Sequence, residues 1–384
     1  MRAPSSFLVA LALVAGRHDS LMAQSDLTNW RDVAAKVVSR MALVRGERVL
    51  LVGVPGVADP LVPALRDAIR AAGATDLGAI AEHAETPAAW ATDFTRQLEA
   101  ASATSRDENL RSVDAAVMMP GAEANDVVYA AMQRVLATGH GRTVHFHWVG
   151  AYDLAGVPIP MTPDVARVYQ RALLETDYGA LAAKQRALET AMRGGVVRVT
   201  TPAGTDLSFR IGDRPVTKQD GDASAARAAK ARNLIDREVE LPAGAIRVAP
   251  LEESVEGTIA FPPTMWSNER VEGLVLTFAR GRVTAVRATS GREAVERELT
   301  AGGDAARSFR EIALGLNPLL AIPSEGQRWI PYYGYGAGVV RLSLGNNSEL
   351  GGTVRGDYVR WNFFTDATVT VGSDVWVRNG QLVR

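Results

Sequence analysis

The sequence contains no cysteine and very little histidine. Five histidines occur in 384 residues, and none of them follows residue 147. A disulfide framework is therefore excluded. The C-terminal part of the chain also cannot supply by itself a His/Cys zinc site, a Ser-His-Asp triad or a Cys-His pair. The histidines are His18, His83, His140, His145 and His147.

An excess of charge of one sign is also missing. The chain has 42 Lys and Arg against 43 Asp and Glu, and no stripe of basic residues with interleaved aromatics. We therefore expect no nucleic-acid partner and no attraction to an anionic membrane. Hydrophobic residues make up 47% and charged residues 22% of the chain, which is typical of a globular protein.

Long apolar runs are absent as well, apart from a short one near the N-terminus. Met1 and Arg2 precede the apolar residues 7–15, and Ala23 stands before Gln24. The run is too short to span a bilayer, and the pattern predicts a secretory signal peptide over residues 1–23. The protein is then exported, to the periplasm or the extracellular space. A misassigned start codon or a frayed helix is the alternative.

The first part of the mature chain, residues 24–193, alternates helical periodicity with short apolar strands. This alternation predicts an α/β domain with a doubly wound parallel sheet. Strands are expected over residues 48–54, 115–119 and 143–149, and helices over 32–43, 59–72, 126–137 and 163–192.

The periodicity changes at Gly194 and Gly195, so the second domain is expected to cover residues 194–384. Its pattern predicts a mostly antiparallel α+β domain. Strands are expected over residues 196–200, 207–211, 274–278, 283–287, 339–344 and 358–364, with a terminal hairpin turning at Asn379 and Gly380, and helices over 292–300 and 304–314.

Five segments of this second half, in order and with compatible spacing, resemble the family of thermophilic-type metallo-aminopeptidases. These segments are residues 201–207, 241–258, 271–283, 311–318 and 338–345. The resemblance implies a homodimeric hydrolase that removes N-terminal residues from peptides. It also implies two metal ions, commonly zinc or cobalt, which polarise the scissile carbonyl and activate a water.

The family's ligands, two Glu, two His and one Asp, carry over poorly. Only one is retained, as Glu311, and the other four positions are Ala245, Arg341, Arg360 and Asn362. The family's substrate-polarising Tyr aligns with Ser348. Alanine cannot ligate a metal, and a guanidinium has no lone pair to offer. We therefore expect no metal ion at this site, and we predict no cofactor.

The arginines suggest a replacement for the lost metal charge. A buried Glu311 without a partner would be costly, so we expect Arg341 and Arg360 to pair with it. Strand alternation places Arg360 and Asn362 on one face. The alternative is that the pocket has only been repacked.

Two further groups of side chains are candidates for the same pocket. Glu252 and Glu253 are candidates for a general acid/base or for binding a substrate amine, and the alternative is a solvated turn. Tyr332 and Tyr335 lie in an aromatic, glycine-rich loop that would stack on a ligand or border a subunit contact. The alternative for these tyrosines is ordinary loop packing.

His145 and His147 form a partial metal site on one strand face. No carboxylate lies near them in sequence, and histidines beside a strand end are a common alternative.

Two functions remain open on these residues. The first is a binding protein for peptides or small carboxylates, because arginine recognises carboxylates in a bidentate manner. Its ligand-binding residues would be Arg341, Arg360, Asn362, Tyr332 and Tyr335. The second is an active aminopeptidase or other hydrolase with a displaced metal or no metal, using Glu311, Glu252 and Glu253.

Overall fold

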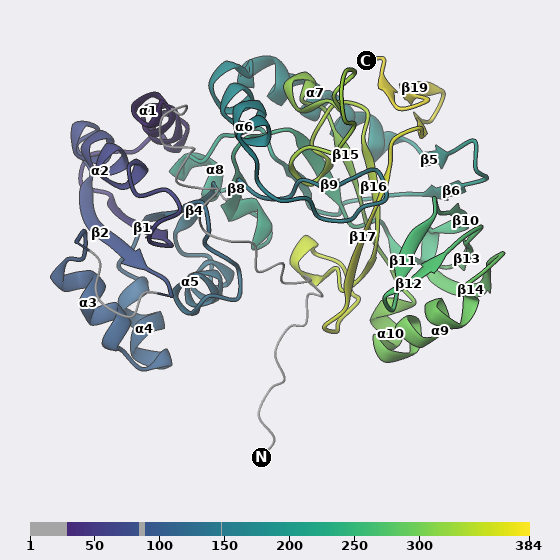
Figure 1. Cartoon of the computed structure of the whole chain (residues 1–384), viewed down its shortest axis with the longest axis horizontal. Helices are drawn as coiled ribbons and strands as arrows, with labels where there is room; N and C mark the ends of the chain where they lie inside the picture. The colour runs from purple at the N-terminus through teal and green to yellow at the C-terminus, as the bar shows by residue number, and fades with distance from the viewer. Residues whose placement is uncertain (1–28, 84–88, 147) are drawn as a thin grey trace.

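A computed structural model describes residues 29–83, 89–146 and 148–384 (Figure 1). The predicted signal peptide, residues 1–23, and one of the two candidate histidines, His147, lie outside the described residues.

The N-terminal part is built on a five-stranded sheet in the order β2-β1-β3-β4-β8. All four strand pairs are parallel. The strands are β1 (Arg48–Gly53), β2 (Thr75–Ala81), β3 (Ala115–Met118), β4 (Arg142–His145) and β8 (Glu238–Glu240). Helices pack around this sheet, as the left half of Figure 1 shows: α1 (Trp30–Met41), α2 (Leu61–Ala71), α3 (Asp93–Ala100), α4 (Ala103–Leu110) and α5 (Val127–Ala137).

Strand β1 shows why this sheet is covered on both faces. Its alternate residues enter two different apolar clusters, with Val49 and Leu51 in one and Leu50 and Val52 in the other. A parallel strand buried on both faces needs a continuous apolar run, which residues 49–52 provide. The predicted doubly wound α/β domain is confirmed.

Two helices, α6 (Pro163–Glu175) and α7 (Tyr178–Gly194), lead into the second half, which contains three antiparallel sheets. The eight-stranded sheet has the order β14-β13-β10-β6-β5-β18-β19-β20. Its strands are β5 (Val197–Thr200), β6 (Asp206–Phe209), β10 (Glu256–Ala260), β13 (Val275–Ala279), β14 (Arg282–Arg287), β18 (Thr368–Val371), β19 (Asp374–Arg378) and β20 (Gln381–Leu382).

The second antiparallel sheet, which we call the central sheet, has the order β17-β16-β15-β9-β7. Its strands are β7 (Val216–Lys218), β9 (Ala245–Val248), β15 (Phe309–Gly315), β16 (Val340–Gly345) and β17 (Val359–Phe364). A two-stranded ribbon of β11 (Thr264–Trp266) and β12 (Glu269–Val271) is separate from both sheets, and the helices of this half are α8 (Ala225–Ala228), α9 (Arg292–Ala301) and α10 (Gly303–Ala306). The predicted antiparallel α+β domain is confirmed.

The helix predicted over residues 304–314 is wrong. Only α10 is helical there, and residues 309–315 form β15, the middle strand of the central sheet. Every residue of β15 is buried, because both faces of the strand are covered. A short run that is buried all round carries no two-residue alternation, so its pattern does not distinguish a strand from a helix.

The two halves are not divided cleanly at residue 194. Strand β8 comes from the second half of the chain but completes the N-terminal sheet beside β4. Only four residues, 241–244, then separate β8 from β9 of the central sheet. This short connection fixes the central sheet against the N-terminal domain.

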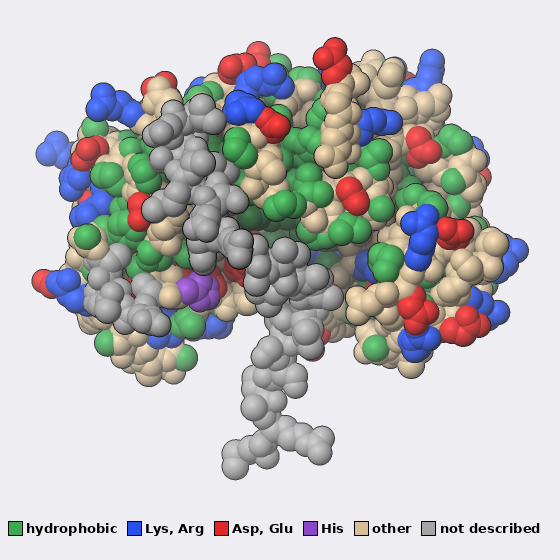
Figure 2. All heavy atoms as spheres, in the orientation of Figure 1, with side chains coloured by type: hydrophobic (Ala, Val, Ile, Leu, Met, Phe, Trp, Pro, Cys, Tyr) green, Lys and Arg blue, Asp and Glu red, His purple; other side chains and the backbone are tan. Residues whose placement is uncertain are grey.

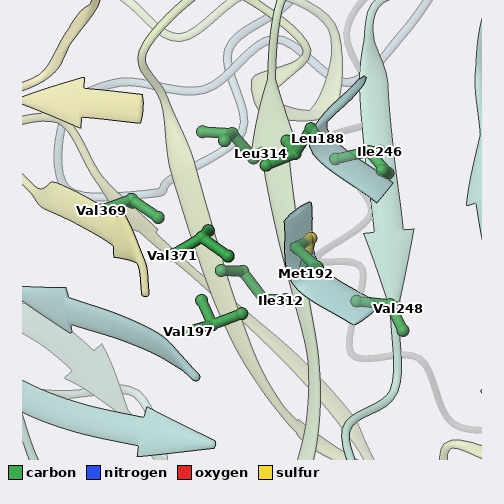
Figure 3. A pocket seen from close by; sticks show the side chains of 9 residues that line it. All are labelled: Leu188, Met192, Val197, Ile246, Val248, Ile312, Leu314, Val369 and Val371. Atoms are coloured by element: carbon green, nitrogen blue, oxygen red, sulfur yellow. The ribbon is translucent and has the colours of Figure 1, made fainter. Parts of the chain in front are cut away.

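One face of the central sheet is apolar where β9 and β15 lie side by side. Ile246, Val248, Ile312 and Leu314 point from it toward α7 and the eight-stranded sheet, around a small cavity lined only by apolar side chains (Figure 3). These side chains form the core of the second half and offer no polar group to a ligand.

The distribution of charge on the surface agrees with the nearly equal numbers of basic and acidic residues in the sequence. Figure 2 shows Lys and Arg side chains interspersed with Asp and Glu over the visible face. Within the described ranges, no helix has the length and apolar character needed to cross a membrane.

Candidate functional site

The opposite face of the central sheet carries a buried group of charges. The register pairs Glu311 with Ser343, and Ala313 with both Arg341 and Arg247. Directly paired residues point to the same face of a sheet. Glu311, Arg341 and Arg247 therefore lie on one face of three neighbouring strands.

Glu311 is fully buried and is held by arginines at both oxygens. Arg247 Nε donates to its Oε2 at 3.0 Å, and Arg341 Nη2 donates to its Oε1 at 2.9 Å. The Ser343 hydroxyl lies 3.4 Å from Oε1. The predicted pairing with Arg341 is confirmed, and the second partner is Arg247.

A β-bulge adds a third arginine. The pairing of β15 with β16 shifts between Phe309 and Glu311, and a bulge of this kind brings consecutive side chains toward the same side. Arg310 Nε lies 3.8 Å from Glu311 Oε1, and its Nη2 donates to Glu349. We call Arg247, Arg310, Glu311, Arg341 and Glu349 the Glu311 cluster.

The arginines decide the ionisation of Glu311. Burial alone would raise its pKa, because a low-dielectric surrounding disfavours the anion. The positive charges of Arg247, Arg341 and Arg310 outweigh this effect and hold the pKa of Glu311 well below its usual range. The carboxylate is therefore ionised throughout the physiological range.

A tyrosine-rich loop covers this face. The carbonyl of Tyr333 accepts a hydrogen bond from Arg341 Nη1 at 3.1 Å. Tyr332 and Tyr333 have left-handed φ values of 36° and 54°, a conformation that non-glycine residues adopt at a cost and that is common at functional sites. Tyr332 and Tyr335 are buried, so the predicted aromatic loop closes over the Glu311 cluster.

Local glycines permit this close packing. A Cβ atom at Gly244, which precedes β9, would lie 2.6 Å from the carbonyl oxygen of Tyr335. Ala245, which stands at a ligand position of the family, follows Gly244 at the start of β9 and pairs with Gly315. Gly244 preserves the shape of the site, because any larger residue there would push the tyrosine loop away.

Arg360 and Asn362 do not reach the Glu311 cluster, so their predicted place in this pocket is wrong. Arg360 pairs with Leu344 and Asn362 with Leu342, which puts both on the face opposite Arg341. Arg360 instead forms an ion pair with Glu298 at 2.8 Å and stacks on Trp266 at 3.7 Å.

Trp361 and Phe363 take the places on β17 that face Glu311. Their partners in β16 are Ser343 and Arg341, and the Arg341 guanidinium lies 4.5 Å from the centre of the Trp361 ring. The alternation along β17 could be predicted, but the register that selects the inner face could not.

The candidate acids Glu252 and Glu253 lie on the turn 252–254. Glu252 forms an ion pair with Arg214 and accepts hydrogen bonds from Asn347 Nδ2 at 3.0 Å and Thr353 N at 2.7 Å. Although burial opposes it, these partners lower the pKa of Glu252. Glu252 thus anchors the loop after β16, and Glu253 is exposed. Ser348 lies in the same loop, where its hydroxyl donates to Asn346.

His145 lies at the carboxyl end of β4 in a second buried cluster. Its ring contacts the Tyr129 hydroxyl at 2.8 Å and lies 3.5 Å from Glu238 and 3.4 Å from Glu240. Tyr332 donates to Glu240 at 2.8 Å. We call these five residues the His145 cluster. Burial alone lowers the pKa of His145, but the two carboxylates raise it overall.

A divalent metal does not fit the donors around Glu311. Both carboxylate oxygens are taken by guanidinium groups, and the neighbouring inward positions hold alanine, arginine, serine, tryptophan and phenylalanine. None of these side chains provides the imidazole, thiolate or carboxylate ligands that zinc needs. Across the residues that the structure describes, no group of three or more His, Asp and Glu is arranged to hold a metal ion.

Two solved structures share the combination of a parallel N-terminal sheet and antiparallel C-terminal sheets seen in this chain. The chain is similar to 2,5-dihydroxypyridine dioxygenase from Pseudomonas putida KT2440, with 17% identity, a TM-score of 0.62, and coverage of 92% of this chain and 96% of that one. It is also similar to wild-type AmpT from Thermus thermophilus, with 17% identity, a TM-score of 0.58, and coverage of 92% and 99%. No curated protein sequence matches.

Part of the sequence also matches the profile of a known family. Residues 179–322 match the profile of the thermophilic metalloproteases (M29). This match covers part of the second half of the chain and agrees with the resemblance seen in the sequence, while AmpT shares the fold.

Sequence reasoning missed Arg247, Arg310 and Glu349. Arg247 could have been found, because it lies two residues after Ala245 and strand alternation puts both on one face. Arg310 depends on the bulge, and Glu349 on the path of a loop. Neither feature has a signal in the sequence.

Proposed function

We propose that this chain is a carboxylate-binding member of the M29 family whose two-metal centre has been replaced by arginines. The observation that carries the proposal is the Glu311 cluster, in which three buried guanidinium groups surround the fully buried carboxylate of Glu311. Guanidinium groups cannot take the place of a Lewis acid in hydrolysis, but they are suited to binding carboxylates.

The charge balance supports a negatively charged ligand. Three arginines face Glu311 and the partly exposed Glu349, so the cluster has a formal excess of one positive charge (3 − 2). Because the guanidinium groups outnumber the carboxylates that face them, the cluster attracts an anionic ligand rather than a cationic one. A peptide with a free terminal carboxylate, or a small carboxylate, has the required charge.

Metal content and binding test this proposal together. Elemental analysis of the purified protein should find no stoichiometric zinc or cobalt, and a leucyl chromogenic substrate should not turn over with either ion added. Calorimetry should detect binding of a leucyl dipeptide but not of its C-terminal amide. Arg341→Gln should weaken binding about tenfold or more, whereas Arg360→Gln on the opposite face should leave it unchanged.

About two metal ions per chain together with turnover would overturn the proposal in favour of an aminopeptidase with a displaced metal site. Family membership favours this second candidate, because the matching profile is that of metalloproteases. Of the acids predicted for it, Glu311 and Glu252 are both held in ion pairs with arginines.

Export and dimerisation are further parts of the proposal. The basic and apolar pattern of residues 1–23 supports a signal peptide, and N-terminal sequencing of the secreted protein should begin at Gln24. The family resemblance supports a homodimer, which sedimentation analysis would detect.

A further inference from the structure

Glu349 separates the buried arginines from solvent. It accepts a hydrogen bond from Arg310, and its Oε1 lies 3.6 Å from Arg247 Nη2. The Glu349 side chain is 37% exposed, whereas those of Arg310 and Arg247 are only 3% and 8% exposed. Solvent therefore reaches the Glu311 cluster along the Glu349 side chain.

The two carboxylates of the cluster differ in how firmly they are held. Glu311 is fully buried and has an arginine hydrogen bond at each oxygen. Glu349 lies in the short turn Ser348–Leu350 after β16 and meets the arginines from the solvent side. Of the two, only Glu349 can leave the arginines without moving a strand of the central sheet.

The arginines also have more donors than these carboxylates use. Among the described residues, the Nε atoms of Arg310 and Arg341 are buried without a hydrogen-bond acceptor. Buried donors are normally paired, so each lacking an acceptor calls for an explanation. An incoming carboxylate has four lone-pair positions and can serve more donors than the single oxygen through which Glu349 binds.

The loop that carries Glu349 is fixed at its base. Asn347 donates to Glu252 at 3.0 Å and accepts from Val354 N at 2.9 Å, and Gly351 ends the turn with a φ of 81°. The backbone on both sides of Glu349 is therefore anchored. Rotation of the Glu349 side chain into solvent would release its contacts with Arg310 and Arg247 without moving this backbone.

We propose that the Glu349 carboxylate is an internal stand-in for the ligand and that a ligand carboxylate binds by displacing it from Arg310 and Arg247. This inference rests on the proposed carboxylate-binding function. It adds that the ligand binds at Arg310 and Arg247, that it binds through its carboxylate, and that Glu349 competes with it there. Glu349 thereby lowers affinity and keeps the arginines paired when no ligand is bound.

Calorimetry on Glu349→Gln tests the displacement. Glutamine keeps the size of the side chain but removes the competing charge. The variant should bind a leucyl dipeptide about tenfold tighter than the wild type does, and the dipeptide amide should bind neither protein. Glu298→Gln is the matched control, because it removes a carboxylate of α9 that pairs with Arg360 on the other face of the same sheet, and it should leave affinity unchanged.

Each outcome separates the two proposals. If the wild type binds the dipeptide and Glu349→Gln binds it no tighter, Glu349 is not a competitor, although the binding function stands. If neither protein binds, the carboxylate-binding function fails and the displacement fails with it. Glu349→Ala, which removes the carboxylate together with most of the side chain, should also bind the dipeptide more tightly than the wild type. Circular dichroism checks that each variant is folded.

Discussion

The two buried ionic clusters neutralise their carboxylates in different ways. In the Glu311 cluster, arginines surround Glu311, and arginine keeps its proton at any pH at which the protein folds. In the His145 cluster, two carboxylates share one imidazole, a group that gains or loses its proton as the pH changes. The first cluster is therefore a permanent charge arrangement, and the second responds to pH.

The loop of Tyr332 to Tyr335 joins these clusters. The Tyr332 hydroxyl binds Glu240 in the His145 cluster, and the Tyr333 carbonyl binds Arg341 in the Glu311 cluster. The loop therefore links the N-terminal sheet to the central sheet by polar contacts at both ends. The variants below test how much each end contributes.

The largest effect is expected from Glu311→Gln. The change leaves three buried arginines with only Glu349 as a counter-charge, and removing one partner of a buried ion pair typically costs about 3–5 kcal/mol. Urea unfolding should show a loss of this size in the free energy of unfolding. A loss below about 1 kcal/mol would mean that solvent or Glu349 compensates, and the cluster would not be a closed charge arrangement.

A smaller loss is expected from Tyr332→Phe, which removes one hydrogen bond to Glu240 and keeps the ring. A hydrogen bond to a charged group contributes about 1.5–3 kcal/mol. Tyr358→Phe is a matched control, because it removes a hydroxyl that donates to Glu298 away from both clusters. Only Tyr332→Phe should also increase hydrogen exchange in the loop of Tyr332 to Tyr335. Equal exchange in both variants would show that Tyr332 does not hold the loop.

The His145 cluster should give stability a pH dependence that the Glu311 cluster lacks. The raised pKa of His145 means that its contribution is complete below the unfolded value of 6.5 and is lost as the pH rises through the folded value. Burial also raises the pKa of Glu238 from 4.5, with the same sign at lower pH. The lowered pKa of Glu311 acts oppositely, because its contribution is lost only on acidification below 4.5.

Melting temperatures from pH 6 upward should therefore fall more steeply for the wild type than for His145→Gln. The groups that face His145 are Glu238 and Glu240 from β8, Tyr129 from α5 and Thr143 from β4. Parallel curves for the two proteins would assign the pH dependence to other groups.

The fold and part of the site could be predicted from the sequence, and individual residues show why the rest could not. The retained Glu311 and the absence of downstream histidine were enough to predict its ion pair with Arg341. Strand alternation correctly put Arg360 and Asn362 together. It could not tell which face of β17 meets Glu311, because the face depends on register with β16, and a shift of one residue reverses every side chain.

The smallest effect is expected from Glu298→Gln in α9, whose carboxylate pairs with Arg360 on the other face of the central sheet. Glu298 Oε1 accepts from Arg360 at 2.8 Å and from Tyr358 at 2.8 Å, and the glutamine oxygen can keep both contacts. Both Arg360 and Glu298 are partly exposed, so water can solvate the remaining charge. The loss in the free energy of unfolding should be about 1 kcal/mol. A loss equal to that of Glu311→Gln would show that burial does not set the difference between the two arginine sites.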